Sequence, residues 1–366
     1  MGGAAATRFL ARYWQKRPLL LRQAFPGLRS ILSRDQLMAL ALRDDVESRL
    51  VTRERGAWTL THGPFRRSHF RGLPARDWTL LVQGVNLHVA AADALLRRFA
   101  FIPYARLDDL MVSYAAPGGG VGPHVDSYDV FLLQGQGRRR WRLSRQRDHA
   151  LEPGLPLQIL ARFRPEEECT LEPGDMLYLP PGVAHDGVAI DACSTHSIGF
   201  RAPAAQDLAT EFLDGLRDAL ALEGRYRDPD LAPSRAPARI DRSLQDYARR
   251  TLSKIAWDKP AIARFLGMTL TEPKATVAFA PPRPALSRTA FTARAKRAGL
   301  LLNRRTQLLY DATLVFINGE AVQPPAAARA TLRRLANDRE LPRGAIPRAA
   351  ADILYRWYRD GFLNVR

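Results

Sequence analysis

The sequence predicts an α+β protein in which an antiparallel barrel or sandwich is followed by helices and by a small mixed C-terminal module. Between Leu107 and Phe200, short runs rich in Val, Leu, Phe, Tyr and Trp are separated by Gly and Pro, the spacing typical of short antiparallel strands. After "RAPAAQDL" (201–208) the strand signals stop and helical patterns begin. The Pro-rich "APPRPALS" at 280–287 marks a second break.

The residues before the barrel predict short helices and a hairpin. Segment 8–16, "RFLARYWQK", has the pattern of an amphipathic helix, and Pro18 ends it before the strand-like "LLLRQAF". Further helical patterns occupy 34–43 and 90–99. Between these two, a pair of short strands is predicted on either side of Gly56.

The residues after the barrel predict helices at 205–223 and 240–266, with the Pro-rich "RDPDLAPSRAPAR" as the loop between them. In the last region "LLLN", "TQLLYD" and "ATLVFINGEAV" are strand-like, and Asn318-Gly319 is typical of a tight hairpin turn. Helices are expected at 326–337 and 347–360. Small strands mixed with helices favour a module of the winged-helix kind.

Composition limits the classes of protein that the chain belongs to. Its 55 Lys and Arg outnumber 37 Asp and Glu, and a formal charge of +18 favours attraction to nucleic acid or to an assembly rich in it. The arginines are spread along the chain, so a basic surface that only faces solvent explains the charge as well as a dedicated binding patch does. Two cysteines are too few for a disulfide framework or a Cys-rich zinc site. With no run of eighteen apolar residues and no recognisable leader, we expect a cytoplasmic protein that makes no use of a membrane.

A candidate metal site is formed by His124, Asp126 and His185. Residues two apart in a strand project from the same face, so His124 and Asp126 present an imidazole and a carboxylate to one space. His185 follows 59 residues after Asp126, just past the turn "PPG" in "PGDMLYLPPGVAHDG". Two histidines and one carboxylate are the facial triad of non-haem Fe(II) oxygenases. Zinc is the competing metal, although a structural zinc site needs four closed ligands.

The run "RRRW" predicts one arginine inside the barrel. If the strand from His124 continues through Gln134 and "GQG" reverses it, "RRRWRL" returns as its neighbour. Strand alternation then places Arg139 on one face with Trp141, and its two neighbouring arginines on the other. A buried guanidinium needs a carboxylate partner, which 2-oxoglutarate supplies in a bidentate ion pair. Ser113, in the inward register of "DLMVS", offers a hydroxyl to the same ligand.

Three segments carry a resemblance to a known family. "DDLMVSYAAPGGGVGPHVDSYDVFLLQGQGRRRWRLS", "PGDMLYLPPGVAHDG" and "YWQKRPLLLRQAFPG" resemble the bacterial ribosomal oxygenases of the YcfD type, which are Jumonji-C cupin 2-oxoglutarate oxygenases. The resemblance extends over essentially the whole chain. It implies a double-stranded β-helix barrel (cupin, Jumonji-C), a helical dimerisation segment and a C-terminal winged helix, at 1–203, 204–279 and 280–366.

The resemblance also implies roles for single residues. His124, Asp126 and His185 match the catalytic iron ligands, Arg139 matches the basic residue that binds the co-substrate, and Ser113 matches a further co-substrate contact. Fe(II) is the implied cofactor, with 2-oxoglutarate and O2 as co-substrates. The implied reaction is hydroxylation of an arginine at C3, the β-carbon, in large-subunit ribosomal protein sixteen, by a homodimeric enzyme.

An arginine substrate calls for an acidic or aromatic contact near the mouth of the barrel. Asp109 shares the inward register of Ser113 and Tyr128 shares that of Asp126, so both are candidate substrate contacts. Thr195 or Ser197 is a candidate for the pocket lining.

Three alternatives stay open at this point. One is hydroxylation of a histidine in another ribosomal protein, as in human relatives of the family. Another is lysine demethylation, which needs the same core. The third is a non-catalytic cupin whose basic winged helix binds nucleic acid directly.

Overall fold

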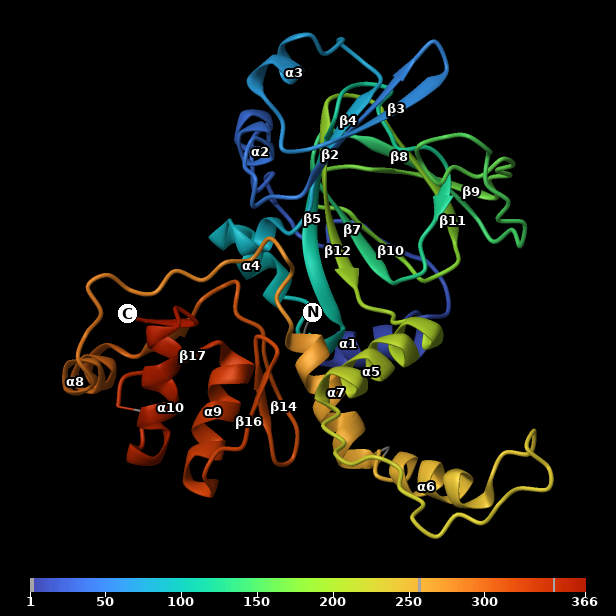
Figure 1. Cartoon of the computed structure of the whole chain (residues 1–366). Helices are drawn as coiled ribbons and strands as arrows, with labels where there is room; N and C mark the ends of the chain where they lie inside the picture. Colours follow the sequence, from blue (N-terminus) through green and yellow to red (C-terminus); the bar gives the residue numbers. More distant parts are fainter. Residues whose placement is uncertain (1–2, 256–257, 345) are drawn as a thin grey trace.

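The computed structural model describes residues 3–255, 258–344 and 346–366. Figure 1 shows a barrel of strands in the upper part of the molecule, helices below it, and a C-terminal module of small strands and helices beside those. The predicted α+β class is confirmed.

The barrel consists of two antiparallel sheets that face each other. Among the described residues, the larger sheet has the order β1-β10-β7-β12-β5-β4-β2-β3 and the smaller has the order β6-β11-β8-β9. The strands of the larger sheet are β1 (Leu19–Leu21), β2 (Ser48–Glu54), β3 (Ala57–His62), β4 (Trp78–Val82), β5 (Leu107–Ala115), β7 (Val130–Gln136), β10 (Met176–Leu179) and β12 (Cys193–Phe200). Those of the smaller sheet are β6 (His124–Val125), β8 (Arg139–Ser144), β9 (Glu167–Leu171) and β11 (Ala184–Ala189).

The prediction of one strand from His124 to Gln134, paired with the arginine strand, was wrong. Strand β6 ends at Val125, and the chain crosses to the larger sheet before β7 begins at Val130. Strand β8 pairs with β11 and β9, so β7 and β8 lie in different sheets. The left-handed Gly137 (φ 60°) lies between them, where a Cβ would come within 2.3 Å of the Ala192 carbonyl oxygen.

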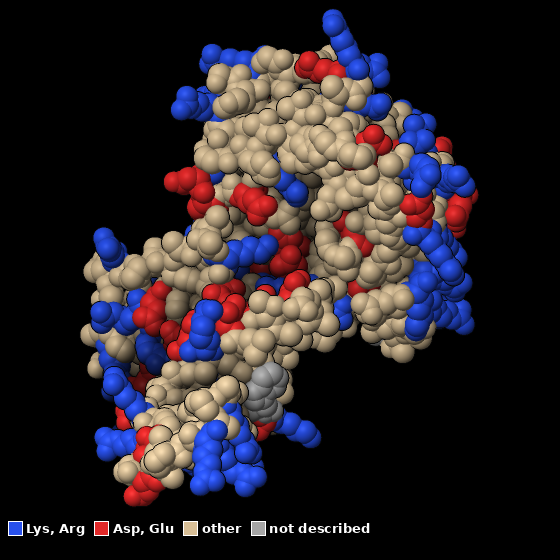
Figure 2. Space-filling model, turned by 45° about the vertical axis from the view of Figure 1, so that its right-hand side comes forward, with Lys and Arg blue, Asp and Glu red and all other residues tan. Residues whose placement is uncertain are grey.

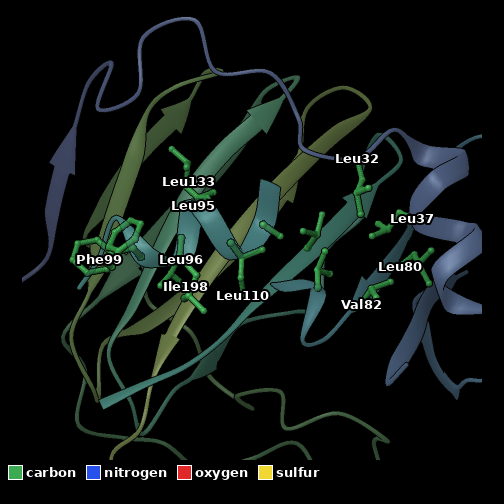
Figure 3. Packing of buried hydrophobic residues seen from close by; sticks show 14 of the residues in the cluster. Leu32, Leu37, Leu80, Val82, Leu95, Leu96, Phe99, Leu110, Leu133 and Ile198 are labelled. Carbon is green, nitrogen blue, oxygen red and sulfur yellow. The ribbon is translucent and has the colours of Figure 1, made fainter. Parts of the chain in front are cut away.

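Helices cover the outer face of the larger sheet and complete its core (Figure 1). They are α1 (Gly3–Arg12), α2 (Arg34–Ala41), α3 (Arg67–Arg71) and α4 (Ala90–Arg97). Figure 3 shows side chains of α2 and α4, among them Leu37, Leu95 and Leu96, packing with Leu80 and Leu110 of the sheet. Burial of these apolar surfaces holds the barrel rigid around its interior.

The first helix lies earlier than predicted. We expected it at 8–16, but α1 ends at Arg12, and Gln15 adopts a left-handed conformation (φ 54°) that turns the chain before Pro18. Its Phe9 ring is buried against Phe131 and Tyr178 of the barrel.

The helices after the barrel are shorter than predicted. Helix α5 (Ala205–Ala219) stops four residues before 223. The predicted helix at 240–266 is two helices, α6 (Arg242–Leu252) and α7 (Lys259–Thr271). Asp258 accepts a hydrogen bond from the Ala261 N–H, a local N-cap that starts α7 afresh.

The C-terminal module has its own core. Its helices are α8 (Arg288–Ala298), α9 (Ala326–Asp338) and α10 (Arg348–Arg359), and its strands are β13 (Leu300–Leu302), β14 (Leu308–Tyr310), β15 (Val315–Ile317), β16 (Glu320–Val322), β17 (Glu340–Leu341) and β18 (Leu363–Val365). The predicted turn at Asn318-Gly319 joins β15 to β16, both residues having positive φ. Leu332, Leu354 and Trp357 are fully buried in this core.

Helix α7 connects the two parts. Gly267 of α7 lies under the Phe316 ring, which a Cβ there would approach to 2.5 Å. Arg201, just after β12, donates a hydrogen bond to the Leu270 carbonyl. In the described residues, no helix has the length and apolar character needed to cross a membrane.

Candidate active site

The three predicted metal ligands meet at one end of the smaller sheet. His124 lies on β6 and His185 on β11, and the two residues are direct partners in the ladder between these strands. Asp126 follows β6, with Oδ1 3.9 Å from His124 Nε2 and Oδ2 3.7 Å from His185 Nε2. The three ligand atoms lie within 4.8 Å of one another. The structure therefore brings together the residues that the spacing predicted.

Backbone contacts orient both imidazoles. His124 Nδ1 lies 2.9 Å from the Gly122 carbonyl oxygen, and His185 Nδ1 lies 3.0 Å from that of Val183. A carbonyl accepts, so each Nδ1 carries the proton and each Nε2 keeps a free lone pair directed toward Asp126. Burial, together with the nearby His124, lowers the pKa of His185 to about 4. The neutral form of His185, which is the form that binds a metal, is therefore the stable form at neutral pH.

A cavity of about 960 Å³ opens beside the triad, in the hollow at the middle of Figure 2. Its walls include β5, β8, β11 and β12, and its mouth is bordered by α5 and α7. The candidate residues that line it are Asp109, Ser113, His124, Asp126, Tyr128, Arg139, His185, Thr195 and Ser197. All the predicted site residues thus face one space.

Arg139 lies inside the barrel, and no carboxylate of the described residues pairs with it. Its Nη1 donates to Ser113 Oγ (3.3 Å) and Thr195 Oγ1 (3.1 Å), and its guanidinium lies 5.3 Å from the Trp141 ring centroid. The side chain is 5% exposed, and its Nε–H has no acceptor among the described residues. Burial lowers the pKa of Arg139, although such a group stays charged at neutral pH.

This arrangement fits a divalent metal with a carboxylate ligand beside it. Two imidazoles and a carboxylate suit Fe(II) and leave coordination positions open, and no thiolate belongs to the cluster. The buried guanidinium, with an unused N–H, suits the far carboxylate of a dicarboxylic acid such as 2-oxoglutarate, because an unpaired buried charge is costly.

Of the two candidate substrate contacts, Asp109 already has protein partners. Its oxygens accept from the Gly84 N–H (2.9 Å), from Gln83 Nε2 (3.2 Å) and from Lys274 Nζ (3.4 Å). Burial raises the pKa of Asp109, and Lys274 opposes that rise. Tyr128 is 40% exposed at the mouth, where burial of its hydroxyl and the neighbouring Asp126 raise its pKa.

Sequence reasoning missed two residues of this site. Gln134 on β7 is fully buried and accepts from Thr195, so it orients one of the hydroxyls that contact Arg139. Lys274 lies after α7, outside the barrel sequence. Strand alternation would have found Gln134 once β7 was placed beside β12, whereas no local signal connects Lys274 to Asp109, 165 residues away.

Two sequence families match this chain. The family model of the JmjC domain matches residues 94–208, and that of the ROXA-like winged helix matches residues 254–364. Both parts of the predicted fold, the Jumonji-C barrel and the C-terminal winged helix, are thereby confirmed.

Relatives resemble the chain over most of its length. It is 36% identical over 321 residues to the ribosomal protein uL16 3-hydroxylase of Escherichia coli (strain K12), which covers 87% of this chain and 85% of that protein. It is 38% identical over 244 residues to the probable ribosomal oxygenase of Haemophilus influenzae, which covers 65% and 58%.

Solved structures agree with the sequence relatives. The X-ray structure of E. coli YcfD matches with a TM-score of 0.85 at 33% identity, covering 98% of this chain and 97% of that one. A structure of YcfD in complex with cobalt and 2-oxoglutarate matches with a TM-score of 0.82 at 33% identity, again covering 98% and 97%.

Proposed function

The chain belongs to the JmjC ribosomal oxygenases, and from this premise we propose that it hydroxylates C3 of an arginine in ribosomal protein uL16, using Fe(II), 2-oxoglutarate and O2. The observation that carries the proposal is the cavity shared by the His-Asp-His triad and the unpaired Arg139. In a scaffold without catalysis, a buried cation directed into the same space as three metal-ligand side chains would cost free energy with no ligand to offset it.

Each of these residues has a role in the proposed reaction. His124, Asp126 and His185 hold the iron through Nε2 and carboxylate oxygens. Arg139 binds the distal carboxylate of 2-oxoglutarate, with Ser113 beside it. Bound iron with 2-oxoglutarate and O2 supplies the oxidising power to insert one oxygen atom into a C–H bond, releasing succinate and CO2.

The protein itself positions the reactants and excludes water. Thr195 and Ser113 hold the Arg139 guanidinium from one side while the Trp141 ring lies against it, so its orientation is set before the co-substrate arrives. Asp109 and Tyr128 are the proposed contacts for the substrate's guanidinium, through a carboxylate and an aromatic ring.

The test is direct. The protein is incubated with Fe(II), 2-oxoglutarate and E. coli uL16 or its peptides, and mass spectrometry locates a gain of one oxygen atom. We expect the gain on C3 of one arginine, dependent on 2-oxoglutarate and absent in His124→Ala. A gain on histidine, or loss of a methyl group from lysine, would replace this proposal with one of its alternatives. No oxygen gain on any ribosomal protein would reject it.

We also propose that the protein is a homodimer joined through residues 204–279. The support is a set of large apolar side chains that the single chain leaves exposed on α5, α6 and α7 and on the loop between α5 and α6. They are Leu208, Leu213, Leu220, Leu222, Leu231, Ile240, Leu244, Leu252, Ile262 and Leu266. Monomers rarely expose so much apolar surface in one region, and a second copy of the same helices is its simplest cover.

Two further assignments accompany these proposals. The division at 1–203, 204–279 and 280–366 is supported by the separate cores of the barrel and the C-terminal module. A cytoplasmic location is supported by a ribosomal substrate. Direct binding of nucleic acid by the basic chain stays an open alternative, tested by titrating ribosomal RNA fragments at varied salt concentrations.

A further inference from the structure

The ammonium group of Lys274 lies against the two carboxylates at the edge of the active-site cavity. Its Nζ is 3.4 Å from Asp109 Oδ2 and 3.6 Å from Asp108 Oδ1. Both aspartates line the cavity that contains the metal triad. Figure 2 shows acidic side chains gathered in this hollow with basic side chains at its border. Lys274 therefore occupies the position beside Asp109 in which the cationic side chain of a substrate would pair with that carboxylate.

The contacts that Lys274 makes are loose. Charge-assisted hydrogen bonds from nitrogen to a carboxylate measure about 2.7–2.9 Å, so 3.4 and 3.6 Å are long. The Lys274 side chain is 39% exposed, whereas that of Asp109 is 4% exposed. Asp108 has a second cationic neighbour, Arg201, at 3.6 Å. The ammonium group can therefore return to water at low cost, while the Asp109 carboxylate cannot.

Other contacts hold Asp109 in place without Lys274. The Gly84 N–H donates to Oδ2 at 2.9 Å and Gln83 Nε2 donates to Oδ1 at 3.2 Å. Both donors are neutral, so they orient the carboxylate but leave its charge unpaired. Asp109 is consequently an oriented, buried carboxylate whose one close cationic partner, among the described residues, is exchangeable.

We propose that Lys274 is an internal counter-ion that pairs with Asp109 before the substrate binds and is displaced by the substrate's cationic side chain. This rests on the proposed function, which supplies the arginine substrate. A guanidinium replaces the long contact of an ammonium with a bidentate pair and so gains from the exchange. Lys274 thus acts on affinity as a positioning residue, and it is not itself a catalytic residue.

The position of Lys274 depends on the contact between the barrel and the C-terminal module. Lys274 lies in the segment between α7 and α8, where its carbonyl accepts from the Val277 N–H. Four residues later, the Ala278 carbonyl accepts from Arg305 Nη1. The same arginine pairs with Asp45 of the barrel part at 3.0 Å. The counter-ion is therefore carried on a segment held by the winged-helix module.

The test measures binding of three uL16 peptides that carry arginine, lysine or neutral citrulline at the target position. The protein is loaded with Co²⁺ and 2-oxoglutarate, and Kd is measured by fluorescence anisotropy. In Lys274→Met the bound state is unchanged, but the free protein no longer has the ion pair that binding must break. We expect both cationic peptides to bind about fivefold more tightly, the size of one partly exposed ion pair, and the citrulline peptide to bind as in the wild type.

Two variants serve as controls. Lys274→Arg keeps a cation beside Asp109, so neither cationic peptide should gain affinity. Lys296→Met removes an exposed charge on α8 and should change none of the three Kd values. In turnover assays Lys274→Met should lower KM for the arginine peptide and leave kcat unchanged.

The outcomes separate this inference from the proposed function. If the wild type hydroxylates the arginine peptide but Lys274→Met keeps wild-type affinities, or weakens binding, the counter-ion role is overturned and the function stands. An equal gain by the citrulline peptide also overturns it, because displacement of a cation requires a cation. If the wild type neither binds nor hydroxylates any uL16 peptide, the proposed function fails, and this inference fails with it.

Discussion

Replacing Arg139 by methionine tests the co-substrate site most directly. The wild-type guanidinium is buried, unpaired among the described carboxylates, and held by Ser113 and Thr195. A bound dicarboxylate would receive two charge-assisted hydrogen bonds from it, each worth about 1.5 kcal/mol or more. Losing about 3 kcal/mol raises the Kd for 2-oxoglutarate by about two orders of magnitude.

That loss is measurable without turnover. In the presence of Co²⁺, 2-oxoglutarate at about 100 times its Kd stabilises the wild type by about 2.7 kcal/mol. At the same concentration, Arg139→Met should gain only about 0.4 kcal/mol. Thermal or denaturant unfolding with and without 2-oxoglutarate gives both values. The ligand-free variant should be no less stable than the wild type, because methionine removes a buried charge that has no carboxylate partner.

Arg140→Met is the matched control, since Arg140 is the next residue on β8 and points to the outer face. It should keep the full stabilisation by 2-oxoglutarate. If Arg139→Met keeps it as well, the co-substrate carboxylate binds elsewhere, and the assignment of the cavity has to be abandoned.

Four further outcomes are expected. Asp126→Ala should abolish hydroxylation and weaken Co²⁺ binding measured by absorption spectroscopy; unchanged metal affinity would reject the triad. Gly187→Ala should lower thermal stability, because a Cβ would come within 2.6 Å of the Trp141 ring, and an unchanged Tm would show that the ring can shift. Burial lowers the pKa of His196 to about 4, so between pH 6.5 and 4 the unfolded state binds more protons than the folded state. The free energy of unfolding should therefore fall as the pH drops through that window. His196→Gln should reduce the dependence of the unfolding free energy on pH. Leu213→Glu should convert a dimer to monomers in light scattering, and an unchanged mass would exclude α5 from the interface.

Local rules of strand geometry were sufficient for the parts of the site that lie on single strands. Alternation along "RRRW" correctly directed Arg139 inward. The spacing of His124 and Asp126 correctly predicted that their side chains come together, although β6 ends at Val125 and Asp126 lies just beyond it. The pairing of strands was a different matter. The prediction paired β7 with β8 as a hairpin because a glycine-containing turn lies between them. The same turn instead connects strands that belong to two different sheets.

By itself, the sequence determined the three candidate metal ligands, the inward arginine and the succession of barrel, helices and C-terminal module. These features depend on residue type and on short spacings. In a strand or a helix, such spacings decide which side chains share a face, independently of the surrounding structure. Only the tertiary structure decided which strands are neighbours, and that Asp109 is paired with Lys274, 165 residues away. Such contacts depend on packing between segments that are distant in the sequence. The residues next to an aspartate in the sequence do not indicate which cation will pair with it.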